Sequence, residues 1–254
     1  MLQAPRFIGF TNYIRLLLDD DIFLIVFKNT LVFAFITGPV SYVLSFLLAW
    51  MINEYRPFAR SIWTLIFYTP SLAGAAIFYI WPIIFSGDVY GLLNSFLMRT
   101  GIIQEQIDFL GNTDYILGVL LTVQIWLSFG AGFLSFIAGL QNVDNSLYEA
   151  GRIDGIKNRW QELWYITIPS MKPQLLFGAV MQISGSFSVS EVIRQVGGFP
   201  TKGYVGDTVG TYIIDYGTVR FEMGYACTLS VVLFLVMLFT NSIITKLLRG
   251  SGND

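Results

Sequence analysis

Five stretches of the chain contain no charged residue, and they set the main pattern of the sequence. They cover residues 29–53, 61–87, 115–143, 173–190 and 223–245, and their lengths run from 18 to 29 residues. A charge in hydrocarbon is costly, and about 20 apolar residues cross a bilayer core of ~30 Å. Each stretch therefore predicts a transmembrane helix. The expected fold class is an all-α polytopic membrane bundle, with five spans forming one transmembrane domain over residues 1–254.

Composition removes several alternative classes of protein. The hydrophobic share is 54 %, the charged share is 13 % and the mean hydropathy is +0.62. A soluble domain of this length has too small an interior to bury so much apolar surface. The absence of histidine and the single cysteine exclude histidine-based catalytic triads, histidine metal sites and an intrachain disulfide. A net charge of −2 offers no basic field for nucleic acid.

Lysine and arginine predict the orientation of the chain in the membrane. Segments 54–60, 144–172 and 246–254 share one side and carry 8 of these residues in 45 positions, against 7 in the 87 positions of the other side. The positive-inside rule places the denser side, with the C-terminus, in the cytoplasm. The N-terminal residues would then lie outside although they show no signal-peptide pattern. This mismatch leads us to expect an additional span before Met1.

The segment between the third and fourth predicted spans, residues 144–172, is more than a connector. Two short amphipathic stretches flank Gly155, which can break a helix by adopting a positive φ, and the second stretch ends at Pro169. Periodicity alone leaves two interpretations open. The segment is either a knob that projects from the membrane or an ordinary interfacial helix on the lipid headgroups.

This loop carries a family resemblance. The run Glu149-Ala150-Gly151, then Gly155, then Ile166-Thr167-Ile168-Pro169 resembles the EAA loop of ABC importer permeases, whose pattern is E-A-A, a glycine four residues on, and I-x-L-P. The sequence Tyr148-Glu149-Ala150, followed by Ile153-Asp154-Gly155, is similar to that of the carbohydrate branch of these binding-protein-dependent permeases. Further stretches extend the resemblance over nearly the whole chain: Phe7–Gly9, Asn12-Tyr13, Asn29–Leu31, Tyr90–Asn94 and Met223–Ala226. Three departures occur: Gly151 replaces the second alanine, Ile168 replaces leucine, and ten residues rather than nine separate Gly155 from Ile166.

The resemblance implies a six-span permease that imports a sugar or oligosaccharide through the prokaryotic cell membrane. It implies a second, homologous permease subunit, separate nucleotide-binding ATPase subunits that bind ATP and Mg, and an extracytoplasmic solute-binding protein. This chain has no G-x-x-x-x-G-K-[ST] phosphate loop and is expected to hold no cofactor or metal itself. The expected ATPase-coupling residues are Tyr148, Glu149, Ala150, Gly151, Asp154, Gly155 and Pro169, with the small residues leaving room for the approach of a partner's backbone.

A polar face in the fourth span predicts part of a substrate path. Gln182, Ser186 and Ser190 recur at i, i+4 and i+8, and Glu191 follows at the outer end. Amide and carboxylate groups can bind sugar hydroxyls, and aromatic rings such as Tyr68, Trp126 and Trp81 could stack on a sugar ring. The same spacing is equally typical of helix-packing contacts, and Arg194 could simply pair with Glu191.

Three other functions compete with sugar import. An integral-membrane enzyme would need histidine or acidic clusters at adjacent helix ends, and an ion channel or proton-coupled carrier would need carboxylates inside the spans. The charge-free windows favour neither, so we expect a protein that is not an enzyme. An importer permease for a solute other than a sugar remains compatible with the sequence.

Overall fold

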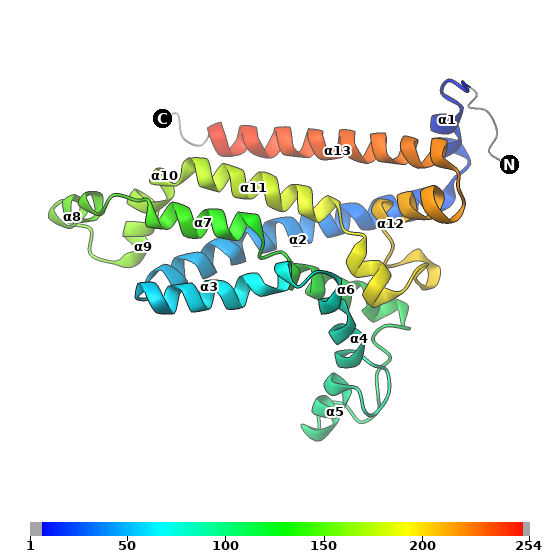
Figure 1. Cartoon of the computed structure of the whole chain (residues 1–254), viewed down its shortest axis with the longest axis horizontal. Coiled ribbons are helices and arrows are strands. Elements are labelled where there is room, and N and C mark those ends of the chain that lie inside the picture. The colour runs from blue at the N-terminus through cyan, green and yellow to red at the C-terminus, as the bar shows by residue number, and fades with distance from the viewer. Residues whose placement is uncertain (1–6, 251–254) are drawn as a thin grey trace. The chain divides into compact units, whose positions relative to one another are not determined.

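The computed structural model describes residues 7–250, which are helical with no strand (Figure 1). The longer α-helices are α2 (Asp21–Asn53), α3 (Pro57–Leu72), α6 (Thr113–Leu127), α7 (Ala131–Gln141), α11 (Lys172–Phe187) and α13 (Met223–Gly250). The shorter α-helices are α1 (Thr11–Leu18), α4 (Ile80–Ile84), α5 (Leu92–Arg99), α8 (Asn145–Ile153), α9 (Arg159–Glu162), α10 (Ile168–Ser170) and α12 (Val209–Ile214). Short 3₁₀ turns cover Gly74–Tyr79 and Lys202–Tyr204, and π-helical turns cover Leu163–Thr167, Ile193–Gly197 and Asp215–Val219. The all-α fold class is confirmed.

Each of the five charge-free windows contains helix, but the windows differ in whether one straight helix crosses. Asp21–Asn53, Thr113–Gln141 and Met223–Leu248 are long and apolar enough to span a membrane, with mean hydropathies of 2.0, 1.8 and 2.2. The second window holds two helical pieces that meet at 87°, where Gly74 takes a φ of +57°. The fourth window holds α11, whose 16 residues extend about 24 Å at ~1.5 Å per residue. The described helices thus support three or four spans by length, and the count of five stays a prediction.

The chain divides into two compact units that alternate along the sequence. The first unit comprises residues up to Ala34, Phe78–Thr122 and Phe187–Phe239, and the second comprises Phe35–Ile77, Val123–Ser186 and the residues from Thr240 on. Both α2 and α13 contribute to each unit. The predicted single transmembrane domain stays a prediction.

The first unit is held together by aromatic side chains around one carboxylate. Asp20 accepts hydrogen bonds from the hydroxyls of Tyr212 (2.9 Å) and Tyr225 (2.5 Å). The rings of these two tyrosines are buried in one apolar cluster with Phe23 and Leu229. A buried tyrosine hydroxyl requires such an acceptor, because burial without one costs free energy. The carboxylate therefore joins the start of α2 to α12 and α13.

A second buried carboxylate, Asp207, organises the loop before α12. Its side chain accepts bonds from the backbone N–H of Thr201 (2.9 Å) and the hydroxyls of Thr201 (2.6 Å) and Thr211 (3.3 Å). Burial raises the pKa of the Asp207 carboxyl, and these three hydrogen bonds oppose that shift. Asn29 of α2 donates to the carbonyl oxygens of Tyr204 (2.8 Å) and Asp207 (3.0 Å). The loop is thereby fixed to α2 by buried polar contacts.

The second unit packs α2, α7 and α11 around phenylalanine side chains. Phe46 and Tyr42 of α2 make edge-to-face contacts with Phe136 of α7, at centroid distances of 5.7 and 5.4 Å. Gly178 of α11 lies directly against the Phe136 ring, where a Cβ atom would overlap it. A small residue is needed at this crossing, as is common where membrane helices approach closely.

Candidate functional site

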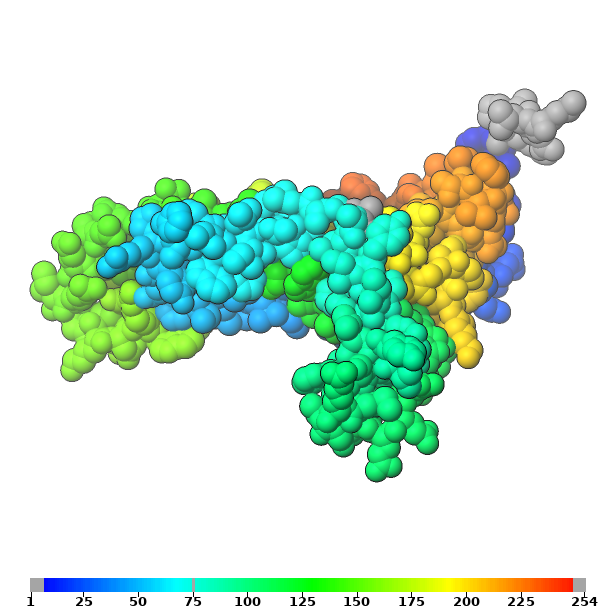
Figure 2. Space-filling view, turned by 60° about the horizontal axis from the view of Figure 1, so that its bottom comes forward, coloured from blue at the N-terminus to red at the C-terminus, as the bar shows by residue number. Residues whose placement is uncertain are grey.

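The loop of residues 144–172 folds into two short helices joined by a glycine, as predicted. The Asp144 carboxylate caps α8 by accepting from the backbone N–H of Ser146 (2.9 Å), and this bond lowers the pKa of Asp144. The Asn158 side chain caps α9 by accepting from the N–H of Gln161 (2.9 Å). Gly155, between the two helices, has a φ of +95°. Figure 2 shows the loop, in yellow-green, at the surface beside the cyan α3.

Inside the loop, α8 is braced against the π-helical turn that follows α9. The Tyr148 hydroxyl lies 2.9 Å from the Thr167 hydroxyl. Gly151 is buried, and a Cβ atom built on it would lie 2.7 Å from Cδ1 of Ile166 and 3.0 Å from Cδ1 of Ile156. The expectation that Gly151 leaves room for a partner is therefore wrong. Its lack of a side chain is used for packing within the loop.

The other predicted coupling residues lie on the outside of the loop. Glu149, Ala150, Asp154, Gly155 and Pro169 are exposed, and Tyr148 is half-buried. Ile153 lies among them and is 87 % exposed. The exposed face of the loop therefore combines one apolar side chain with a carboxylate and two small residues.

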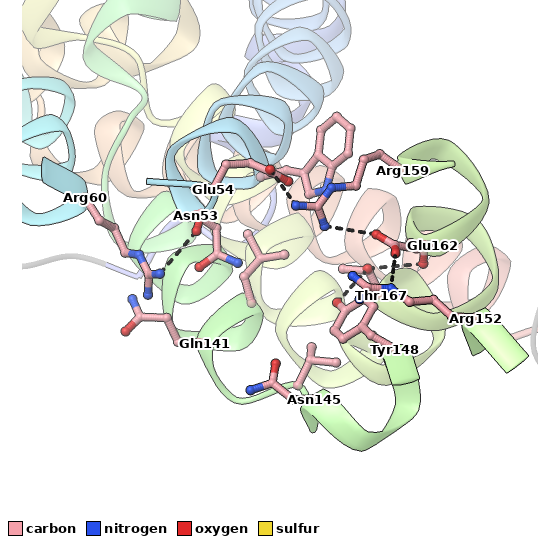
Figure 3. A pocket seen from close by; sticks show the side chains of 13 residues that line it. Asn53, Glu54, Arg60, Gln141, Asn145, Tyr148, Arg152, Arg159, Glu162 and Thr167 are labelled. Carbon is pink, nitrogen blue, oxygen red and sulfur yellow. Dashed lines mark hydrogen bonds and ion pairs between the residues drawn. The ribbon is translucent and has the colours of Figure 1, made fainter. Parts of the chain in front are cut away.

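A charged cluster and a cavity lie between the loop and the turn from α2 to α3 (Figure 3). Glu162, whose side chain is 10 % exposed, pairs with Arg159 at 2.9 Å and with Arg152 at 3.7 Å. Arg159 also pairs with Glu54, just beyond the end of α2, at 2.6 Å. The cavity has a volume of about 380 Å³ and is lined mainly by polar side chains, including Asn53, Arg60, Gln141 and Asn145.

A second, smaller cavity lies among α2, α6, α7 and α11 and is called here the polar groove. Its volume is about 230 Å³, and its lining residues are Thr37, Ser41, Gln124, Leu127, Ser128, Gly130, Ala131, Gly132, Met181, Gln182, Gly185 and Ser186. Ser41 is 1 % exposed, and its hydroxyl oxygen has no hydrogen-bond partner among residues 7–250. A buried hydroxyl without a partner is costly, and water or another polar molecule that enters the groove can satisfy it.

Two of the predicted substrate-path residues lie in the polar groove. Gln182 donates from Nε2 to the Ser45 hydroxyl and to the Ser128 carbonyl, both at 3.2 Å. The Ser186 hydroxyl donates to the carbonyl of Ile183 (2.8 Å) and faces Gly38 of α2. Both residues therefore make helix-packing contacts, which was the alternative interpretation of their spacing.

The remaining substrate-path candidates lie elsewhere. The prediction that Ser190 shares a helical face with Gln182 and Ser186 is wrong, because α11 ends at Phe187, while a role of Ser190 and Glu191 in a substrate path stays a prediction. The regular backbone hydrogen bonds of α11 do not continue beyond Phe187. The Val189 carbonyl oxygen accepts from the Thr208 hydroxyl (2.6 Å). The Glu191 carboxylate accepts from Nε2 of Gln195 (2.8 Å) and lies 4.0 Å from the Arg194 guanidinium, as the packing alternative proposed.

The aromatic candidates do not line the polar groove. Tyr68 lines a separate open cleft with Ile137 and Gln141, and Trp126 is half-buried on α6. Trp81 belongs to α4 in the first unit. Sequence reasoning missed Ser41, although a signal existed. Thr37, Ser41 and Ser45 recur at i, i+4 and i+8 within a charge-free window, and all three are buried.

The sequence matches the family described as "Binding-protein-dependent transport system inner membrane component" over residues 41–250. One relative, the arabinooligosaccharides transport system permease protein AraP of Bacillus subtilis, is 31 % identical over 250 residues, with 97 % of this chain and 78 % of AraP covered. The lactose transport system permease protein LacF of Rhizobium radiobacter is 29 % identical over 240 residues, which cover 91 % of this chain and 78 % of LacF.

The fold is similar to that of a chain in the crystal structure of a bacterial alginate ABC transporter in complex with alginate pentasaccharide-bound periplasmic protein. The TM-score is 0.83 at 23 % identity, and the match covers 97 % of this chain and 84 % of that chain. The relatives are transport permeases and not enzymes, and the match runs through both the loop and the polar groove. The chain therefore belongs to the binding-protein-dependent inner membrane component family, the multi-pass membrane permeases of ABC transporters.

Proposed function

We propose that the chain is a permease subunit of an ATP-driven importer for a sugar or oligosaccharide. The proposal includes a second permease subunit, a solute-binding protein outside the membrane and ATPase subunits that bind ATP and Mg. Several relatives are named for the transport of arabinooligosaccharides or lactose, which supports the substrate class. A direct test is to purify the chain with the transporter subunits encoded beside it and to measure ATP-dependent uptake of labelled sugars. Uptake of a different class of solute would contradict the substrate class and leave the permease role intact.

The observation that supports the coupling role is the arrangement of the loop of residues 144–172. Its outer surface presents Glu149, Ala150 and Ile153, while its inner surface is fixed by Tyr148 and the buried Gly151. A knob braced internally in this way can move as a rigid body when a partner moves it. Glu149 is exposed and can accept a charge-assisted hydrogen bond from a basic side chain of the ATPase subunit.

The polar groove is the proposed place of contact with the sugar. Sugars offer many hydroxyls, each of which can donate and accept, and the groove offers hydroxyl and amide groups with the same double capacity. The Ser41 hydroxyl, which makes no hydrogen bond within the described part of the chain, can make such a bond. Gln182 can exchange its two bonds of 3.2 Å for bonds to a sugar during transport.

Replacing Gln182 by leucine is expected to lower sugar uptake by roughly tenfold, because a polar partner is removed from a desolvated site. Assembly with the ATPase subunits is expected to persist. The matched control is Val180→Leu, two positions away on the same helix and not among the residues that line the groove. ATP-dependent uptake in membrane vesicles measures the effect. Equal uptake by the Gln182 variant and the control would limit this residue to a packing role.

Orientation is tested with the native chain's single cysteine, Cys227, replaced by alanine. In this background we expect Arg56→Cys to react with a membrane-impermeant maleimide only from the cytoplasm, and Lys202→Cys to react only from outside. Labelling of Arg56→Cys from the cytoplasm alone would agree with a cytoplasmic C-terminus, which lies on the same side as Arg56 in the proposed topology. Labelling of both positions in intact cells would overturn that topology.

A further inference from the structure

The loop touches α2 through side chains at three places. The Arg159 guanidinium pairs with the Glu54 carboxylate at 2.6 Å. The rings of Trp50 and Trp160 lie 5.3 Å apart. Leu163 belongs to the same apolar core as Ala49 and Ile52 of α2. These contacts join segments that are far apart in the sequence, since 105 residues separate Glu54 from Arg159.

The contacts matter because α2 has no covalent connection nearby that would make it follow the loop. In contrast, α7 leads directly into the loop and α11 leads directly out of it. A displacement of the loop therefore reaches α7 and α11 through the backbone. It reaches α2 only through non-covalent contacts.

Packing between the loop and α2 is incomplete. The cavity of about 380 Å³ has a lining that includes Trp50 of α2, Glu54 just after α2, and Arg152 and Arg159 of the loop; the last three are labelled in Figure 3. Close-packed side chains would transmit a displacement by steric contact, and a cavity interrupts such contact. The ion pair between Glu54 and Arg159 crosses this interrupted region.

The far end of the ion pair is attached to two helices at once. Arg60 at the start of α3 donates from Nη2 to the carbonyl oxygens of Asn53 (3.1 Å) and Tyr55 (3.4 Å), on either side of Glu54. The turn that carries Glu54 is therefore fixed to α3. A force on the Glu54 carboxylate acts on the ends of both α2 and α3.

The polar groove has one wall whose helix continues from the loop through the backbone and one wall whose helix contacts the loop only through side chains. Thr37 and Ser41 on one wall belong to α2, and Gln182 and Ser186 on the other belong to α11. We infer that Glu54 and Arg159 are positioning residues that make α2 follow the coupling loop, so that both walls of the groove move together. This inference rests on the proposed coupling of the loop to an ATPase.

Glu54 is the residue to change in a test. Its side chain is 41 % exposed and that of Arg159 is 58 % exposed, so the pair contributes little to folding and its loss leaves no buried charge. Changing Arg159 would also deprive the nearly buried Glu162 of a partner. The substitution Glu54→Gln keeps the size of the side chain and removes its charge.

The experiment uses the full transporter in proteoliposomes and measures the number of sugar molecules imported per ATP hydrolysed. Glu54→Gln is expected to lower this ratio about two- to fivefold, the range an exposed ion pair can account for, with unchanged assembly. Glu54→Asp, which keeps the charge, is expected to restore most of the ratio. The control is Glu105→Gln, an exposed carboxylate in the first unit.

A second variant separates attachment from charge. In a chain with Cys227 replaced by alanine, Glu54→Cys and Arg159→Cys are combined and joined by a short bismaleimide. Cross-linking is expected to raise the transport ratio of this variant above its value before the reagent, because a covalent link replaces the ion pair. A wild-type ratio in Glu54→Gln, or a ratio in Glu54→Asp no higher than that in Glu54→Gln, would overturn the inference while the proposed function stands. If the chain does not assemble with ATPase subunits at all, the proposed function itself fails.

Discussion

Replacement of Gly155 by valine is expected to reduce ATP-dependent uptake by roughly tenfold or more. Gly155 has a φ of +95°, and a β-branched residue held at positive φ costs about 1–3 kcal/mol. The loop can relieve this strain only by changing the angle between α8 and α9. That change displaces the exposed surface around Glu149 from the position that the proposed contact with an ATPase subunit requires. Uptake and substrate-stimulated ATP hydrolysis, measured on the same preparation, report the loss of coupling.

The matched control for this variant is Gly155→Asn. Asparagine tolerates positive φ better than other residues with a side chain, and a Cβ atom at this position meets no other atom within 4 Å. Activity is therefore expected to be reduced much less by asparagine than by valine. Equal activity in the valine variant and the wild type would show that this backbone conformation is not needed for coupling.

Replacement of Gly178 by leucine is expected to prevent the stable packing of α7 against α11. Even a methyl group at this position would overlap the Phe136 ring, so Gly178→Ala is expected to lower the free energy of unfolding by about 1–3 kcal/mol. The larger leucine is expected to reduce the amount of folded protein in the membrane. Thermal unfolding of the detergent-solubilised transporter and its yield measure the two effects.

Gly185 provides the control on the same helix. A Cβ atom built there meets nothing within 4 Å, so Gly185→Ala is expected to leave the thermal transition nearly unchanged. A drop of the same size in both alanine variants would attribute the effect to a general helix property. Contact with Phe136 would then not explain it.

Charge-free windows located the helices because the energetic cost of a charge in lipid acts on every residue of a span. The same windows could not show that the backbone turns at Gly74 or that α11 stops at Phe187. Both features depend on the local conformation and on distant hydrogen-bond partners, such as the Thr208 hydroxyl that binds the Val189 carbonyl. The prediction that Ser190 shares a helical face with Gln182 and Ser186 was wrong for this reason.

In the candidate site, sequence reasoning succeeded where the signal was local. Gly155 and the two short helices around it followed from residue type and spacing. The burial of Gly151 did not, because it depends on contact with Ile166 in the π-helical turn that follows α9. The pairing of Glu54 with Arg159 was equally inaccessible, since no periodicity relates residues 105 positions apart.

The composition of α13 has a consequence for how the protein is made. Only 11 % of its apolar window is buried against the rest of the chain, compared with 39 % for Asp21–Asn53 and for Thr113–Gln141, yet its mean hydropathy is the highest at 2.2. The other described helices are already synthesised when α13 emerges from the ribosome, and they offer it little surface to bind. Its entry into the bilayer therefore depends on its own transfer free energy. A charged substitution near its centre, for example at Val236, should act as a failure of insertion during synthesis, before any tertiary fold is tested.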